Sequence, residues 1–277
     1  MKPAVPEVVV EGMGLHTGAP ASVLLRPWDG PVCLRVGDCT ARIDELRVAS
    51  TARATTVEAY NGALRVGTVE HAFAALGGLG IHAGVCLEID GPELPLLDGC
   101  ATAWCDALSR IHSVSGSPRL RIRRAAVLEI GPSVYEFEPD AGEERTHIEV
   151  RVKLDDERID PVAVWSGGAD DFRERIAPAR TFATAKDLEE LARCGLARHV
   201  PPTAVVLLAP DGVLFSGRAF AHDEPARHKL LDLVGDLYLH GGPPLGRLRA
   251  TRPGHAANAR AFACAREQGI LVSGVED

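Results

Sequence analysis

A set of polar side chains stands in otherwise apolar or glycine-rich surroundings: Glu70, His71, Thr181, His228, Asp232, Asp236 and His255. Two histidines and one aspartate among them make a three-ligand set that suits a zinc site with one open position for water. Zinc lowers the pKa of its bound water to about 7, which supplies hydroxide at neutral pH. A neighbouring carboxylate can then accept the water's proton, and a further histidine can protonate a leaving amine. The residues alone make metal-assisted hydrolysis one coherent option, because they are scattered along the chain.

The helix predicted over residues 224–238 carries two of these side chains. It is apolar over much of its circumference, yet His228 and Asp232 lie four residues apart on one face. Burying both groups is costly unless they are paired or hold a metal. Taken alone, however, such a pair most often forms a hydrogen bond on a helix surface. Gly235 follows one turn later, where a missing side chain lets another element approach closely.

A second helix is predicted to begin after Thr68, which suits an N-cap, and to end at the pair Gly77-Gly78. Glu70 and His71 fall in its first turn and point about 100° apart, so they can flank one site. An isolated histidine in this position usually serves capping or packing. His16 lies in the glycine-rich turn of residues 11–18, where bonding to nearby backbone and a functional placement are equal alternatives.

Both halves of the chain show several short strands and then a helix with a histidine near its start. Alternating or apolar runs predict strands at residues 8–10, 21–26, 32–36, 53–57 and 85–90, and again at residues 120–130, 134–138, 147–154, 204–208, 213–215 and 245–250. Other helices are predicted at residues 101–110, 186–194 and 256–268. This repetition predicts two similar α+β domains that face each other. Such domains would bring His71 and His228 to a shared cleft.

The polar, small-residue segment 113–118 is the best linker signal, so we place the domain boundary there. A first domain, residues 1–115, would carry Glu70 and His71. A second domain, residues 119–277, would carry His228, Asp232 and His255.

The bulk composition narrows the class of protein. The 277 residues are 46% hydrophobic and 25% charged, as in ordinary globular proteins, and the net charge of −8 argues against a general nucleic-acid or membrane-surface role. Seven cysteines without Cys-x-x-Cys spacing do not suggest a disulfide framework, so we expect reduced thiols and a cytoplasmic protein. The N-terminus lacks a signal-peptide core, and no apolar run approaches 18 residues.

Several motifs occur in a fixed order along nearly the whole chain: Gly-Met-Gly-Leu-His-Thr-Gly18, Thr-Val-Glu-His71, Gly-Pro-Glu-Leu-Pro-Leu-Leu-Asp-Gly99, Ala-Arg-Thr-Phe182, Asp-Glu-Pro-Ala-Arg-His-Lys-Leu-Leu-Asp-Leu-Val-Gly-Asp-Leu-Tyr238 and Gly-His-Ala-Ala-Asn258. In combination they resemble the UDP-3-O-acyl-N-acetylglucosamine deacetylases, zinc amidases of lipid A synthesis in Gram-negative bacteria. The resemblance implies two α+β domains, each a mostly antiparallel sheet with helices, and helices packed between the two sheets. It also implies a small-molecule UDP-sugar as substrate.

Carried over residue by residue, the resemblance implies zinc on His71, His228 and Asp232. Iron is the alternative, because histidine and aspartate ligands suit either metal. Glu70 would be the general base. His255 would be the general acid or the oxyanion stabiliser. The protein would act as a monomer without a nucleic-acid partner or an integral membrane segment.

The remaining assignments that the resemblance implies concern the surroundings of the reacting groups. Asp236 would hold the charged form of His255, and Thr181 would help polarise the amide carbonyl. Lys229 would meet the substrate's diphosphate, which suits an ammonium point charge. Phe182 and His16 would also bind substrate.

This sequence departs from the family pattern at positions that bear on recognition of the acyl chain or of the nucleotide. Thr184 stands where the family usually has an aromatic residue, residues 198–203 replace a glycine-rich segment, and a lysine that the family carries near Ser133 is absent. A divergent paralogue that deacetylates another N-acetylated sugar is therefore the first alternative. A non-catalytic zinc-binding regulatory relative is the second.

Overall fold

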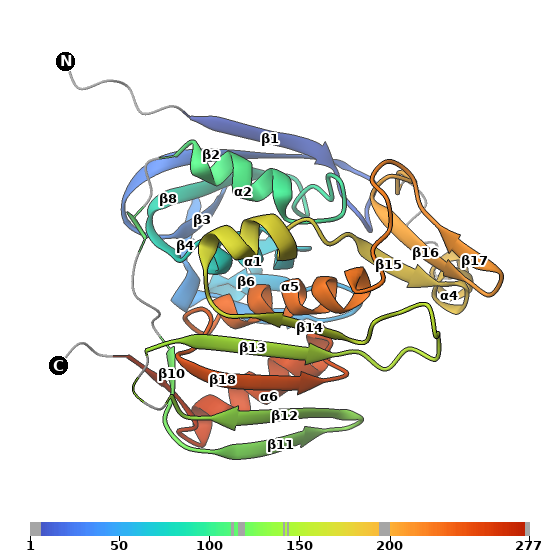
Figure 1. Ribbon diagram of the computed structural model, residues 1–277. Coiled ribbons are helices and arrows are strands. Elements are labelled where there is room, and N and C mark those ends of the chain that lie inside the picture. Colours follow the sequence, from blue (N-terminus) through green and yellow to red (C-terminus); the bar gives the residue numbers. More distant parts are fainter. Residues whose placement is uncertain are drawn as a thin grey trace.

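Two sheets enclose a central pair of helices in the computed structural model, which describes residues 7–111, 114–115, 120–140, 142, 144–193 and 200–274. The central helices are α1 (Glu70–Gly78) and α5 (Glu224–Tyr238), which pack against each other. α1 also packs on one sheet and α5 on the other, and the layers are visible in Figure 1. The predicted α+β class with helices between two sheets is thus confirmed.

The sheet of the first half has the strand order β1-β2-β8-β3-β4. Its strands are β1 (Val8–Met13), β2 (Pro20–Pro31), β3 (Cys33–Val36), β4 (Cys39–Arg42) and β8 (Ile81–Asp90), and β9 (Val114–Ser115) pairs with β8. The sheet of the second half has the order β11-β12-β18-β13-β14. Its strands are β11 (Ala126–Ile130), β12 (Ser133–Glu138), β13 (Thr146–Arg151), β14 (Val162–Trp165) and β18 (Gly246–Thr251).

The two sheets repeat one topology. In each, the strand that follows the central helix enters the middle of the sheet, antiparallel to one neighbour and parallel to the other. All other pairs within these two five-strand paths are antiparallel. Each central strand is also followed by a further helix, α2 (Thr102–Ser109) or α6 (His255–Glu267). The repetition inferred from the sequence is therefore a property of the fold, whereas the domain boundary stays a prediction.

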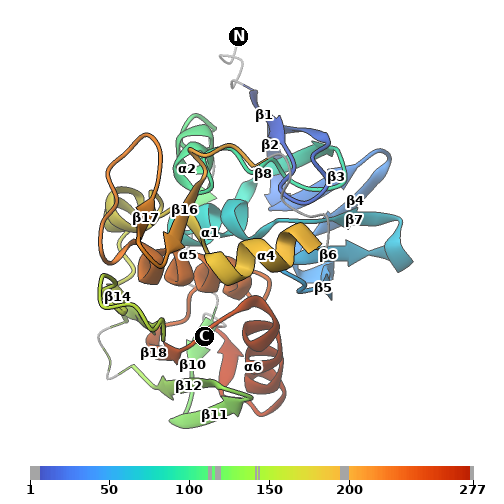
Figure 2. The same cartoon turned by 90° about the vertical axis from the view of Figure 1, so that its right-hand side faces the viewer.

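Smaller elements complete the chain. One three-stranded sheet joins β5 (Arg47–Ser50), β6 (Thr56–Ala59) and β7 (Leu64–Val66), and another joins β15 (Thr181–Thr184), β16 (Val205–Ala209) and β17 (Gly212–Leu214). β10 (Leu120–Ile122) pairs with β19 (Leu271–Ser273), and short helical segments span Ile43–Glu45, Tyr60–Gly62, Ala169–Asp171 and Phe172–Ile176. Figure 2 shows α4 (Ala185–Arg193) at the level of the central helices. None of the helices in the described part of the chain has the length and apolar character needed to span a membrane.

The central helices approach each other so closely that glycine is required at their contact. All of α1 and most of α5 are buried, so both helices are packed against other parts of the protein nearly all round. A Cβ built on Gly235 would lie 2.1 Å from the carbonyl oxygen of Glu70, which is far inside van der Waals contact. The close approach predicted at Gly235 is thus confirmed, and its partner is the backbone of the residue that precedes His71.

Replacing Gly235 with alanine should therefore destabilise the protein. The neighbouring atom is backbone and cannot rotate away, so the helices must separate, at a cost of about 1–3 kcal/mol or more. Urea unfolding measures this as a lower midpoint. Gly212→Ala is the matched control, because a Cβ there meets no atom within 4 Å. Equal midpoints for the two variants would refute the steric argument.

Three local predictions are wrong. Residues 120–130 form two strands in different sheets, because β10 pairs with β19 while β11 pairs with β12. The predicted strand 53–57 begins only at Thr56, since Arg53 has a φ of 69° and turns the chain. Thr68 is not a cap: its hydroxyl donates to Glu93, and α1 follows Val69. The linker 113–118 lies outside the described residues except for β9, as does the end of the predicted helix 186–194.

Candidate metal centre and active-site cleft

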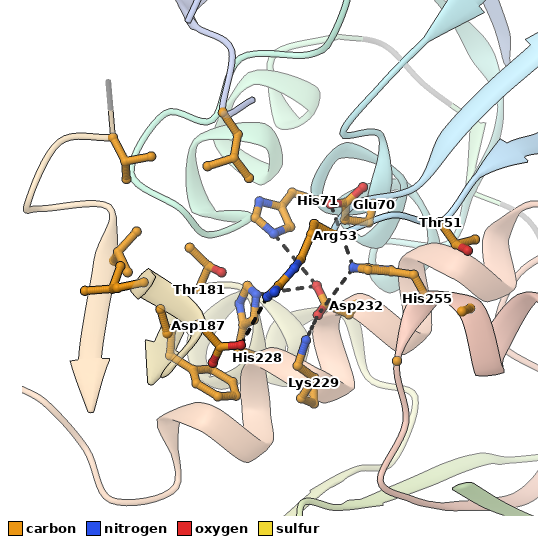
Figure 3. A pocket seen from close by; sticks show the side chains of 18 of the residues that line it. Thr51, Arg53, Glu70, His71, Thr181, Asp187, His228, Lys229, Asp232 and His255 are labelled. Carbon is orange, nitrogen blue, oxygen red and sulfur yellow. Dashed lines mark hydrogen bonds and ion pairs between the residues drawn. The ribbon is translucent and has the colours of Figure 1, made fainter. Parts of the chain in front are cut away.

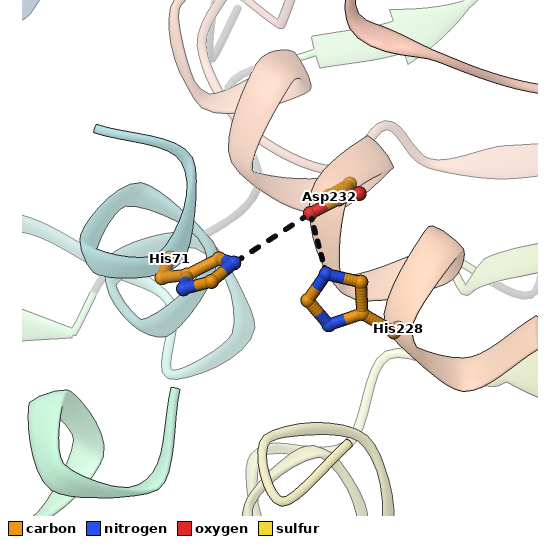
Figure 4. A group of neighbouring side chains, drawn as sticks. All are labelled: His71, His228 and Asp232. Atoms are coloured by element: carbon orange, nitrogen blue, oxygen red, sulfur yellow. Dashed lines mark ion pairs between the residues drawn. The ribbon is translucent and has the colours of Figure 1, made fainter. Parts of the chain in front are cut away.

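Three side chains from the two halves converge at the contact between the central helices. His71 comes from the first turn of α1, and His228 and Asp232 come from one face of α5. The Nε2 atoms of His71 and His228 lie 3.8 Å and 3.4 Å from Oδ1 of Asp232 (Figure 4). One potential ligand atom from each residue lies within 4.8 Å of the others, and all three residues are buried. His228 and Asp232 therefore do not form a solvent-exposed pair on the surface of the helix.

Hydrogen bonding and charge show that this cluster is suited to a cation. Nδ1–H of His228 donates to the carbonyl oxygen of Ala179 at 3.0 Å, so its Nε2 carries a lone pair that faces the Asp232 carboxylate. Two acceptors face each other here, and Oδ1 of Asp232 has no hydrogen-bond partner among the described residues. A metal ion between them would satisfy both acceptors and would also bind the third ligand, His71. The residues present therefore fit the metal that the ligand types imply.

The protonation states agree with ligation. Burial lowers the pKa of His71 to about 3 and also lowers that of His228, so both imidazoles are neutral at pH 7. Burial alone would raise the pKa of Asp232, but the basic side chains around it, led by His228 and Lys229, hold it below its usual value. Two neutral imidazoles and one carboxylate are the forms that bind a divalent metal.

A carboxylate and an imidazole stand beside the three ligands. Oε2 of Glu70 accepts the backbone N–H of Thr55 at 3.0 Å, while Oε1 lies 3.9 Å from Nε2 of His255. Burial raises the pKa of Glu70 to about 7, which suits a group that takes up and releases protons near neutrality. Burial would lower the pKa of His255, but Asp236 and Asp232 outweigh it and raise the value to about 10. His255 is therefore a cation with its Nε2 toward the site.

A buried hydrogen-bond network lies behind His255. Its Nδ1 is 3.0 Å from Oδ2 of Asp236, and that oxygen also accepts from the side-chain amide of Asn258 at 2.7 Å. Asn258 in turn accepts from the hydroxyl of Tyr135 at 2.6 Å, and Thr55 donates to Oδ1 of Asp236 at 2.7 Å. Sequence reasoning gave no role to these last three residues. Asn258 belongs to one of the recognised motifs and could have been found, whereas Thr55 carries no local signal.

These groups open into a single cleft of about 930 Å³. Thr181, Phe182, Lys229 and His16 line it together with the three ligands, Glu70 and His255. Figure 3 shows Thr181 and Lys229 on opposite sides of His228. Nζ of Lys229 lies 2.8 Å from Oδ2 of Asp232 and 5.6 Å from the Phe182 ring centre. Neither ring nitrogen of His16 has a partner among the described residues, so the ring is not the backbone-bonded turn histidine of the alternative interpretation. All the site residues singled out in the sequence therefore lie in or directly behind the cleft.

One arm of the cleft is apolar. Its walls come from α4 and from the β16–β17 hairpin and the loop before it, with Leu188, Pro201, Val205, Leu207 and Leu214 among them. Lining residues in the segment 198–203 are Val200, Pro201 and Pro202, while residues 198 and 199 lie outside the described part of the chain.

Two polar contacts hold α4 beside this arm. The backbone N–H and hydroxyl of Thr184 donate to Oδ2 of Asp187 at 2.9 Å and 2.6 Å, and the N–H of Asp187 donates back to the Thr184 hydroxyl, so Thr184 caps the helix. Arg53 reaches across from the first half to Asp187 at 3.1 Å and to Glu190 at 2.6 Å. The threonine that departs from the aromatic pattern is thus a helix cap, and the helix is tied to the other half.

Comparisons with known proteins give a consistent picture. The family model described as LpxC, UDP-3-O-acyl N-acetylglycosamine deacetylase, matches residues 5–264. Proteins named UDP-3-O-acyl-N-acetylglucosamine deacetylase from Brucella melitensis biotype 2, Brucella ovis and Brucella suis are each 32% identical over 275 residues, which cover 92% of this chain and 91% of theirs.

Proposed function

The chain belongs to this UDP-3-O-acyl N-acetylglycosamine deacetylase family, and we propose on that premise that it hydrolyses the N-acetyl group of UDP-3-O-acyl-N-acetylglucosamine in lipid A biosynthesis, releasing acetate and a free amine. The observation that carries the proposal is the buried His71–His228–Asp232 cluster with a carboxylate and a charged imidazole at its edge. This arrangement provides one group to accept a proton and another to donate one within a single cleft.

We propose zinc as the metal, held by His71, His228 and Asp232, with ferrous iron as the alternative that the same ligands accept. Bound there, the metal would polarise the amide carbonyl and lower the pKa of a water molecule. The proposal is supported by the unpartnered Asp232 oxygen and by the lone pair of His228 that faces it.

The proton transfers are assigned to the chain's own residues. Glu70 accepts a proton from the attacking water, whose oxygen bonds to the acetamide carbonyl carbon. His255 donates its Nε2 proton to the sugar nitrogen as the C–N bond breaks, and Asp236 supports its charge through Nδ1. The Thr181 hydroxyl, on the cleft wall, donates to the carbonyl oxygen. The acid and the base thus lie on one side of the ligand cluster, with Nε2 of His255 3.9 Å from Oε1 of Glu70.

The substrate's other parts are assigned by chemistry. The apolar arm along α4 and β16–β17 suits the acyl chain, which gains about 0.8 kcal/mol for each methylene it buries. Phe182 and the unpartnered ring of His16 would contact the sugar end of the substrate. Lys229 would turn toward the diphosphate from its present contact with Asp232. We propose a cytoplasmic monomer, a location supported by the free state of the six described cysteines.

Comparing acylated with non-acylated UDP-N-acetylglucosamine tests the substrate assignment. We expect kcat/KM for the 3-O-acylated compound to be higher by on the order of 100-fold, since burial of only four methylenes supplies that factor. Steady-state release of acetate measures both substrates under the same conditions. Equal turnover would instead favour the paralogue that acts on another N-acetylated sugar, an alternative motivated by the changed residues Thr184 and Pro201–Pro202 beside the apolar arm.

A further inference from the structure

Thr55 forms hydrogen bonds both with the proposed base, Glu70, and with the Asp236–His255 pair that contains the proposed acid. It lies in the turn just before β6, is only 2% exposed and belongs to the first half of the chain. Its backbone N–H donates to Oε2 of Glu70 at 3.0 Å. Its hydroxyl donates to Oδ1 of Asp236 at 2.7 Å and lies 3.2 Å from Nδ1 of His255. One residue therefore links a carboxylate from α1 to a pair from α5 and α6.

The Thr55 hydroxyl has a single proton, so it can donate a hydrogen bond to only one of its two partners, Asp236 and His255. Because that proton is committed to Asp236, the oxygen presents a lone pair to Nδ1–H of His255. The two oxygens of Asp236 are then both engaged, Oδ1 by Thr55 and Oδ2 by His255 and Asn258, so the carboxylate cannot rotate freely. The ring of His255 is held with its proton on Nδ1 inward and its Nε2 toward Glu70 and Asp232.

The main chain of Thr55 makes a separate contribution, because it forms hydrogen bonds at the start of α1. Its carbonyl oxygen accepts the N–H of Val69 at 3.2 Å, and its N–H holds Glu70, so the peptide clamps the start of α1. With Oε2 of Glu70 held, Oε1 remains for the cleft. A change confined to the side chain of Thr55 leaves this clamp in place, which makes the two contributions separable.

We propose that Thr55 is a positioning residue that aligns the base Glu70 with the acid His255 across the interface of the two halves. Its peptide orients Glu70, and its hydroxyl orients His255 both through Asp236 and by direct contact. The inference rests on the proposed function for the roles of acid and base, and on the described hydrogen bonds for the alignment. Sequence reasoning missed Thr55, since its partner Asp236 is 181 residues away.

The test compares Thr55→Val, which removes only the hydroxyl, with Thr55→Ser, which keeps it. We expect Thr55→Val to lower kcat by about 10- to 100-fold, the range for losing a hydrogen bond to a charged group, with KM changed by less than about twofold. Thr55→Ser should restore kcat to within about threefold of wild type. Thr56→Val, at the next and less buried position, is the matched control and should retain wild-type kcat. Thermal unfolding and metal content of each variant show that the fold and ligands are retained.

A double-mutant cycle tests the route of the effect. Because the hydroxyl acts partly through Asp236 and partly by direct contact with His255, Thr55→Val should cause a smaller loss of kcat in an Asp236→Ala background than in the wild-type background. A wild-type kcat in Thr55→Val, no rescue by serine, or a full further loss in the Asp236→Ala background would each overturn the proposal.

A spectroscopic readout keeps this inference apart from the proposed function. In protein labelled with ¹⁵N-histidine, the hydrogen-bonded Nδ1–H of His255 should give a protected downfield proton resonance in wild type and Thr55→Ser, and a shifted or exchange-broadened one in Thr55→Val. The same resonance in all three proteins would refute the positioning role. Absence of deacetylation by the wild-type protein would refute the proposed function, while the resonance would still decide whether Thr55 holds His255.

Discussion

Replacing Glu70 with glutamine is expected to lower kcat by about 10²- to 10⁴-fold, the usual contribution of a general base, while the metal stays bound. The amide has nearly the shape of the carboxylate and can still accept the N–H of Thr55, but it cannot take up a proton. Glu70 is separate from the ligand cluster, so its loss of charge should leave the metal in place. Steady-state kinetics together with metal analysis of the same preparation measure both effects.

The matched control is Glu88→Gln on β8, a partly buried carboxylate that pairs with Arg26 and Arg35 away from the cleft. It should retain kcat within about twofold, as surface changes of this kind usually have small effects. Activity of Glu70→Gln within tenfold of wild type would remove Glu70 from the role of base. Loss of metal together with activity would assign it to the ligand set instead.

Replacing Asp232 with alanine should abolish both metal retention and activity. Its carboxylate is the anionic member of the cluster, and without it two neutral imidazoles face the ammonium of Lys229, which repels a cation. We expect metal affinity to fall by more than about 100-fold, beyond the effect of losing a residue that only supports a ligand. Dialysis followed by elemental analysis gives the metal content, and acetate release gives the activity.

Thermal unfolding offers a reading of Asp232→Ala that does not depend on catalysis. A metal that binds only the folded state stabilises it by about 2.7 kcal/mol at 100 times its dissociation constant. Added zinc should therefore raise the unfolding midpoint of the metal-depleted wild type and leave that of Asp232→Ala nearly unchanged. Asp223→Ala, at the start of the same helix and paired with Arg227, is the control and should respond like wild type. A stoichiometric metal content in Asp232→Ala would disprove the assignment of this ligand.

Much of the fold was predictable because its pattern is local. The apolar circumference of residues 224–238 indicated a buried helix, and alternating runs indicated strands whose topology proved to repeat in the two halves. Local patterns failed where tertiary contacts decide. The residues around Thr68 suggest a helix cap, yet its hydroxyl donates a hydrogen bond to Glu93. Likewise, nothing in the sequence of residues 120–130 shows that its first and last parts form strands of different sheets.

The site itself was only partly accessible to sequence reasoning. His228 and Asp232 could be paired by their spacing, but the choice between a surface hydrogen bond and a metal site depended on resemblance to a family. The structure settles the burial of this pair and brings His71 to it, 157 residues earlier in the chain than His228. The hydrogen bonds of the Thr55 and Tyr135 hydroxyls could not be foreseen, because each joins residues more than 100 positions apart.

The glycine at the centre of the helix pair has a consequence for anyone who wishes to redesign this protein. Since Gly235 rests directly on the carbonyl of Glu70, the spacing of α1 and α5 is a contact between main chains, with no side chain that could be trimmed or enlarged by degrees. The distance of His71 from the two ligands on α5 is inherited from that contact. Adapting the site to an ion of another radius therefore requires a change in how α1 and α5 pack. Exchanging the ligands alone would leave the distance between the two helices unchanged.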